Sequence, residues 1–197
     1  MHILHNAIKH GISFLDVPVE SVVTLIYDRF SISAARIESL KEFTEFVHLE
    51  CLPAIGRLLV MFDAVFAYFV SMEKEDCPRQ TAKMLGATFN GTPEDNGNEV
   101  RIYLNFASYF SENLQTAILK MEKHGFSWVE IHSVMVDLRD RLVDKLRNEM
   151  YGTKTLHLLE NLEDPTKRRK IMKNFYTFFS KGMHRRICVF SGCVNTR

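Results

Sequence analysis

The chain has 197 residues, of which 46% are hydrophobic and 25% are charged, so it can bury one core and has the composition of an ordinary globular protein. A formal net charge of +1 excludes polyanion binding through overall charge, so any nucleic-acid contact must come from a local patch. Four scattered cysteines do not form a secreted disulfide scaffold, which predicts reduced thiols in an intracellular protein.

Two segments resemble targeting or membrane elements only superficially. The N-terminal residues MHILHNAIKHG carry histidine and asparagine where a signal peptide needs an unbroken apolar run. The apolar segment Cys51–Met72 contains Arg57 and Asp63, each of which costs about 2.5–3.5 kcal/mol near the centre of a bilayer. We therefore expect no export signal and no membrane partner, and we predict that Cys51–Met72 is a buried core helix.

The first 89 residues predict a helical N-terminal segment. Pro18 suits the start of its first clear helix, whose apolar residues recur at three- and four-residue spacing as Val19, Val22, Ile26 and Phe30. Ser33 is a candidate N-cap for a second helix with the apolar stripe Ile37, Leu40, Phe43 and Val47. A longer helix is predicted around Pro53–Glu73 and a short one from Pro78 to about Phe89.

Residues 90–98, NGTPEDNGN, predict a loop that divides the chain, because glycine, proline and asparagine disfavour a continuing helix. A pair of long helices is predicted beyond it. The apolar stripe of the first helix consists of Phe106, Phe110, Leu114, Ala117 and Met121, and that of the second of Ile131, Met135, Leu138, Leu142 and Leu146. The short turn at Lys123–Ser127, with Ser127 as N-cap, predicts that the two helices are antiparallel. The outer face of the second helix has mixed charge and predicts an Asp137–Arg141 pair.

Two more helices are predicted, at Lys154–Leu162 and at Pro165–Lys181, the second entered through Asp164. They complete a second helical region, residues 99–182. Residues 183–197 are predicted to be an irregular tail, in which Arg186–Val194 either forms a short strand or is untethered. The predicted fold class is all-α, a multi-helix array or bundle built around the antiparallel pair of long helices.

Histidine and cysteine are not arranged as metal ligands. The spacing of His2, His5 and His10 does not place them on one helical face, and neither cysteine nor carboxylate completes a set nearby. His184, Cys188 and Cys193 would supply three zinc ligands without a fourth in local reach. We predict no metal site and no cofactor.

The motifs that usually accompany catalysis are missing as well. Serine does not occur in a G-x-S-x-G setting, and the glycines fit neither a P-loop nor a dinucleotide-binding fingerprint. The acidic residues Asp63, Glu73, Glu75 and Asp76 are predicted to be solvated charges without the pairing that two-metal chemistry needs.

One cluster of charge stands out at the start of the last predicted helix. It consists of Lys167, Arg168, Arg169, Lys170 and Lys173, and Lys181, Arg185 and Arg186 follow beyond. Such a basic run neutralises phosphates or acts as a nuclear import signal, whereas the alternative is an ordinary solvated helix surface. The interleaved aromatic residues Phe175, Tyr176, Phe178 and Phe179 are at helical spacing and are predicted to form the buried face.

Two blocks of the N-terminal segment resemble the hAT-type DNA transposases. The first reads HILHNAIKHG, then FLDVPVESVVTLIYDRFSIS and RIESLKEFTEFV, and is similar to the region after the second catalytic aspartate of that family. The second, LPAIGRLLVMFDAVFAYFVSMEKEDCP, matches the family pattern at Leu52, Ile55, Arg57, Leu58, Leu59, Ala64, Tyr68, Phe69, Cys77 and Pro78. Together the two blocks cover roughly residues 2–85. The resemblance implies an ancestor that cut and joined DNA with two aspartates and a glutamate on an RNase H-like sheet.

Almost none of that machinery can be carried over to this chain. The aspartates would precede Met1 and the glutamate would follow Arg197, while the family's Arg-Trp-Leu-Ser block, expected just before Leu52, is missing. We therefore expect a catalytically inactive remnant of a hAT-family transposase, nuclear and without enzyme activity. Its expected partners are DNA, through the basic patch, or a second copy or another protein, through apolar helix faces left exposed. The alternative function is a helical scaffold or dimerisation protein with no nucleic-acid role.

Overall fold

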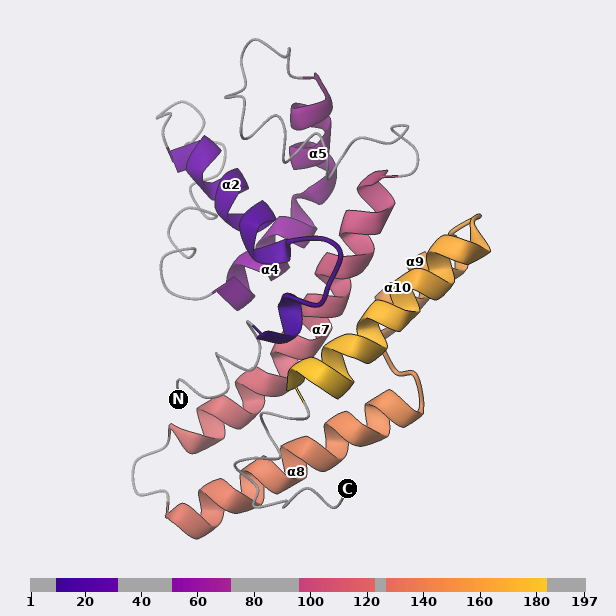
Figure 1. Cartoon of the computed structure of the whole chain (residues 1–197). Helices are drawn as coiled ribbons and strands as arrows, with labels where there is room; N and C mark the ends of the chain where they lie inside the picture. Colours follow the sequence, from indigo (N-terminus) through magenta and orange to yellow (C-terminus); the bar gives the residue numbers. More distant parts are fainter. Residues whose placement is uncertain (1–9, 32–50, 72–95, 123–126, 184–197) are drawn as a thin grey trace. The chain divides into compact units, whose positions relative to one another are not determined.

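The computed structural model describes residues 10–31, 51–71, 96–122 and 127–183, and all regular structure within them is helical (Figure 1). The elements are α2 (Val19–Ser31), α4 (Cys51–Val60), α5 (Phe62–Ser71), α7 (Asn96–Met121), α8 (Trp128–Arg147), α9 (Thr153–Glu160), α10 (Pro165–Thr177) and the π-helix η2 (Phe178–Met183). The described residues contain no strand, which confirms the all-α prediction. The helices predicted at 33–47 and 78–89, and the tail from His184 onward, lie outside the described residues.

Helix α7 begins earlier than the sequence predicts. It starts at Asn96, so Asn96–Asn98 are helical and do not belong to the loop predicted at 90–98. Glu99 in its first turn favours this start, because a carboxylate there interacts well with the positive end of the helix dipole. The chain forms two compact units, residues 17–108 and residues 1–16 with 109–197, so the division falls inside α7 at Ser108–Tyr109.

The unit of residues 17–108 is built on apolar faces. Val19, Val22 and Ile26 of α2 are buried, as their spacing predicts. The helix predicted over Pro53–Glu73 is instead two helices, α4 and α5, separated at Met61. Buried Ile55, Leu58, Phe62 and Val65 continue one stripe across that break. The apolar periodicity was therefore informative about burial, although it did not reveal the interruption.

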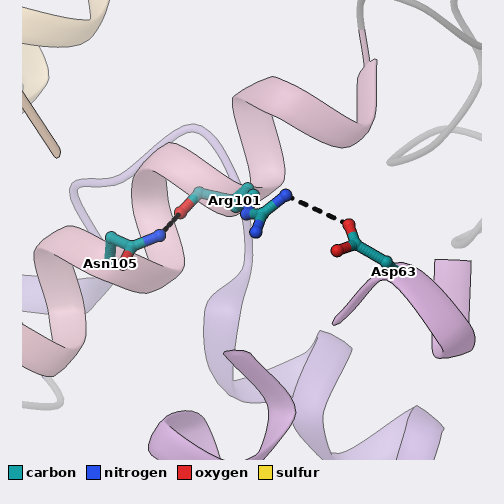
Figure 2. A network of polar contacts seen from close by, with 3 residues as sticks. All are labelled: Asp63, Arg101 and Asn105. Atoms are coloured by element: carbon teal, nitrogen blue, oxygen red, sulfur yellow. Dashed lines mark hydrogen bonds and ion pairs between the residues drawn. The ribbon is translucent and has the colours of Figure 1, made fainter. Parts of the chain in front are cut away.

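Asp63 of α5 is paired across this unit with α7. Its carboxylate accepts a hydrogen bond from Nη1 of Arg101 at 3.0 Å (Figure 2). The Arg101 guanidinium also lies 5.6 Å from the centre of the Phe62 ring. The side chain of Asp63 is 83% exposed, in agreement with its prediction as a surface charge. Within the described residues, no helix is long and apolar enough to cross a membrane.

The second unit contains the predicted antiparallel pair. Ser127 accepts a hydrogen bond from the backbone N–H of Glu130, whose carboxylate accepts one from the N–H of Ser127, so α8 begins with a complete capping box. Tyr109, in the middle of α7, contacts Lys145 near the end of α8, with 2.5 Å between the phenol oxygen and Nζ. Late Lys120 acts electrostatically on Asp137, in the middle of α8. This order of contacts makes the helices antiparallel, and the predicted Asp137–Arg141 ion pair is present.

An aromatic cluster joins α7 and η2 within the same unit. The Phe110 ring of α7 lies 4.3 Å from Phe179 and 5.8 Å from Phe178, measured between ring centres, and Phe178 and Phe179 are 5.4 Å apart. The helix predicted over Pro165–Lys181 changes from α10 to the π-helix η2 at Phe178. Both consecutive phenylalanines are buried there, and the wider turn of η2 brings them into the cluster together.

Gly11 lets the N-terminal segment approach this cluster. A Cβ atom at Gly11 would lie 2.7 Å from Cε2 of Phe178, whose ring is held by Phe110 and Phe179. We expect Gly11→Ala to lower the free energy of unfolding by about 1–3 kcal/mol through overpacking. Urea denaturation measures this change.

Gly56 of α4 provides the matched control. A Cβ atom there would have no neighbour within 4 Å, so Gly56→Ala should raise helix stability by about 0.5–1 kcal/mol. If the two substitutions changed the unfolding midpoint in the same direction, the proposed contact between Gly11 and Phe178 would not determine stability.

Candidate nucleic-acid interface

The basic cluster lies at the start of α10, which begins as its sequence predicts. Asp164 is the N-cap, and its carboxylate accepts hydrogen bonds from the N–H groups of Thr166 at 2.8 Å and Lys167 at 3.3 Å. These bonds lower the pKa of Asp164, and Pro165 occupies a position that needs no N–H partner. Ile171 and Phe175 form the buried face, which leaves the basic side chains to the rest of the helix surface.

Arg168 does not belong to the exposed patch. Its Nη2 donates to the carbonyl of Glu160 at 2.8 Å and to that of Leu162 at 3.0 Å, while its Nε is buried. Glu160 is the last residue of α9, where helical carbonyls lack partners within the helix. Arg168 therefore closes the end of α9 and joins it to α10. Its role in phosphate binding stays a prediction.

Lys170 is paired within the chain. Its Nζ lies 2.7 Å from Oδ2 of Asp16, in the segment that follows Gly11. Partial burial alone would raise the pKa of Asp16, but hydrogen bonds from Lys170 and Asn174 outweigh that effect and lower it. The positive charge of Lys170 is thus partly offset before any ligand arrives.

Arg169 and Lys173 remain as exposed cations on one side of α10, four residues apart. Lys167 is half-buried, and Lys181 is exposed on η2. Arg185 and Arg186 lie outside the described residues. We call Arg169, Lys173 and Tyr176 the basic face, because spacings of four and three residues place all three on one side of the helix.

Tyr176 is the member of this face that sequence reasoning missed. It was grouped with the phenylalanines as part of the buried face, yet it is 55% exposed, whereas Phe175, Phe178 and Phe179 are buried. Its distance of seven residues from Arg169 and three from Lys173 is the signal that could have placed it with the cations.

Other candidate sites contribute little to the described part of the chain. His10 packs edge-on against Phe14, with ring centres 5.2 Å apart, while His2, His5, His184, Cys188 and Cys193 lie outside the described residues. Among the described residues, no three histidine, cysteine or acidic side chains are grouped as metal ligands.

The chain was compared with models of protein families, with curated proteins and with solved structures, and none of them matches.

The Asp16–Lys170 pair predicts a pH-dependent contribution to stability. Because folding lowers the pKa of Asp16, its ionised carboxylate stabilises the fold at pH values above the ordinary carboxyl pKa of about 3.9. This contribution is lost as the pH falls through the lowered pKa. Because the pair is largely exposed, Asp16→Asn should cost no more than about 1 kcal/mol at pH 7. The difference between wild type and variant in urea denaturation should shrink as the pH is lowered below the ordinary carboxyl pKa. An equal difference at pH 7 and at acidic pH would show that the charge of Asp16 is irrelevant.

Proposed function

We propose that this chain is a transposase-derived helical module without cleavage activity, which binds nucleic acid through the basic face of α10 and works in the nucleus. The exposed pair Arg169 and Lys173 is the observation that carries the binding proposal. It provides the local positive charge that a protein with a net charge of only +1 needs for phosphate contact.

The architecture of α10 supports this role because the opposite side of the helix is occupied. Ile171 and Phe175 are buried within the unit, so the side that carries Arg169 and Lys173 is directed to solvent. A cation on a well-packed helix loses less conformational freedom on binding than one on a free tail. The face thus offers two phosphate contacts from a fixed backbone.

The proposed origin rests on the two blocks of sequence that resemble hAT-type transposases, over roughly residues 2–85. The proposed lack of cleavage activity is supported by the setting of Asp63, which is 83% exposed and ion-paired with Arg101. Metal-assisted strand cleavage requires carboxylates held together on a rigid scaffold.

A scaffold or dimerisation protein is the second candidate, and one observation favours it. Trp128 and Val129, at the start of α8, are 85% and 79% exposed, which is unusual for large apolar side chains. A protein partner could cover them. Binding through such a contact would respond weakly to salt, which separates it from the first candidate.

Salt titration with a fluorescent DNA duplex tests the binding proposal. Affinity should fall as salt rises, and the joint substitution of Arg169 and Lys173 by glutamine should reduce the slope of log K against log salt by about 2, roughly 0.9 for each lost phosphate contact. Fluorescence anisotropy at several salt concentrations measures both quantities. Affinity that does not depend on salt would favour the scaffold.

Arg168→Gln is the matched control, because it removes the same charge one residue away. We expect it to lower stability by at least about 1 kcal/mol through the lost carbonyl contacts while leaving the salt slope unchanged. If Arg168→Gln reduced the salt slope as much as Arg169→Gln does, Arg168 would also contact phosphate, and the separate roles proposed for the two arginines would be contradicted.

The proposed lack of cleavage activity is tested with supercoiled plasmid. Purified protein with Mg²⁺ or Mn²⁺ should leave the plasmid supercoiled, because two-metal strand cleavage needs paired carboxylates and Asp63 is instead paired with Arg101. Nicking or linearisation that a chelator abolishes, and that follows the protein through purification, would overturn this part of the proposal.

A further inference from the structure

We infer that the basic face of α10 takes single-stranded nucleic acid in preference to duplex, with Arg169 and Lys173 on the phosphates and the ring of Tyr176 stacked on an unpaired base. This inference rests on the proposed function, since it names the ligand class of the same face. The three residues contribute different chemistry, and only Tyr176 discriminates between ligand classes.

The spacing of the face suits a strand laid along the helix. With a rise of about 1.5 Å per residue, Arg169 and Lys173 are roughly 6 Å apart along the axis, and Tyr176 follows about 4.5 Å further. Helical side chains lean toward the N-terminus, which brings the Tyr176 ring over the turn that carries Lys173. Cation and aromatic ring are therefore neighbours on one surface.

Tyr176 is exposed, but the helix that carries it is anchored by packing. It lies on the helix that Phe175 anchors, and Phe175 packs against the Tyr151 ring, with 5.2 Å between ring centres. The pKa of the buried Tyr151 phenol is raised to about 12, mainly by burial and also by the nearby Glu149 and Tyr176. Tyr176 itself is 55% exposed.

An exposed ring beside two cations is the combination used for unpaired bases. Base stacking on an aromatic side chain tolerates any sequence, because every base has a π-face, and nearby cations track the backbone. In a duplex each base face is covered by the next base pair, so the ring would find no partner there. Arg169 and Lys173 can contact the phosphates of either ligand.

The other highly exposed aromatic residue among those described lacks this setting. Trp128 is followed by Val129 and by the acidic Glu130, whose carboxylate is held in the capping box at the start of α8. A negative charge there would repel phosphate. Trp128 therefore serves as an internal control for an exposed aromatic ring without the cations.

The experiment compares a labelled oligothymidine of about 12 nucleotides, within the usual site size, with a duplex of the same length, by fluorescence anisotropy. Wild type should bind the single strand more tightly. Tyr176→Leu keeps bulk and helix propensity but removes the ring, and should weaken single-strand binding by roughly 5- to 100-fold and duplex binding by less than about 2-fold. Tyr176→Phe should bind like wild type, and Trp128→Leu should change neither affinity.

The outcomes separate the inference from the proposed function. Salt-dependent binding of duplex, with equal or weaker binding of the single strand, overturns the inference and keeps the proposed function. Equal losses for both ligands in Tyr176→Leu also overturn the inference, provided that circular dichroism shows the variant folded. If wild type binds neither ligand, both proposals fall.

Discussion

The burial of one side of α10 and η2 in aromatic packing is the constraint on which the rest of this unit depends. Phe175 packs on Tyr151, Phe178 and Phe179 pack on Phe110, and Phe178 also lies against Gly11. A helix of 13 residues is marginal on its own in water, so tertiary packing has to hold α10 in place. Once this side is buried, the orientation of each basic residue follows from the helical period.

Five cations that look equivalent in sequence then have different environments. Arg168 is drawn into the junction with α9, where it satisfies two carbonyls, and Lys170 is paired with Asp16. Arg169 and Lys173 lie on the exposed side, where Tyr176 joins them. A functional patch is thus smaller than the basic run suggests, and its chemistry includes an aromatic ring as well as charge. Both proposals for this protein depend on that difference.

Much of the helical framework could be predicted from the sequence, because periodicity and capping are local properties. The stripe of Phe106, Phe110 and Leu114, the Ser127 cap and the Asp164 cap were all predicted and all are present. The break at Met61, the start of α7 at Asn96 and the π-turn at Phe178 were missed. Helix propensity is a property of a single segment, whereas helix breaks and shifted helix ends depend on how segments pack against one another. The sequence did not reveal the pairing of Asp16 with Lys170, because these residues lie far apart in the chain. It did not reveal the exposure of Tyr176, because that exposure depends on which side α10 buries.

Hydrogen–deuterium exchange along residues 165–183 shows whether aromatic packing holds α10 in place. If packing of the aromatic cluster holds α10, the amides of Phe175, Phe178 and Phe179 should exchange only through global unfolding of their unit, with the slowest rates in this segment. Gly11→Ala should speed their exchange together. Exchange as fast as in an isolated peptide of the same sequence would contradict the account, because the side of α10 that carries Arg169, Lys173 and Tyr176 would then have no fixed orientation.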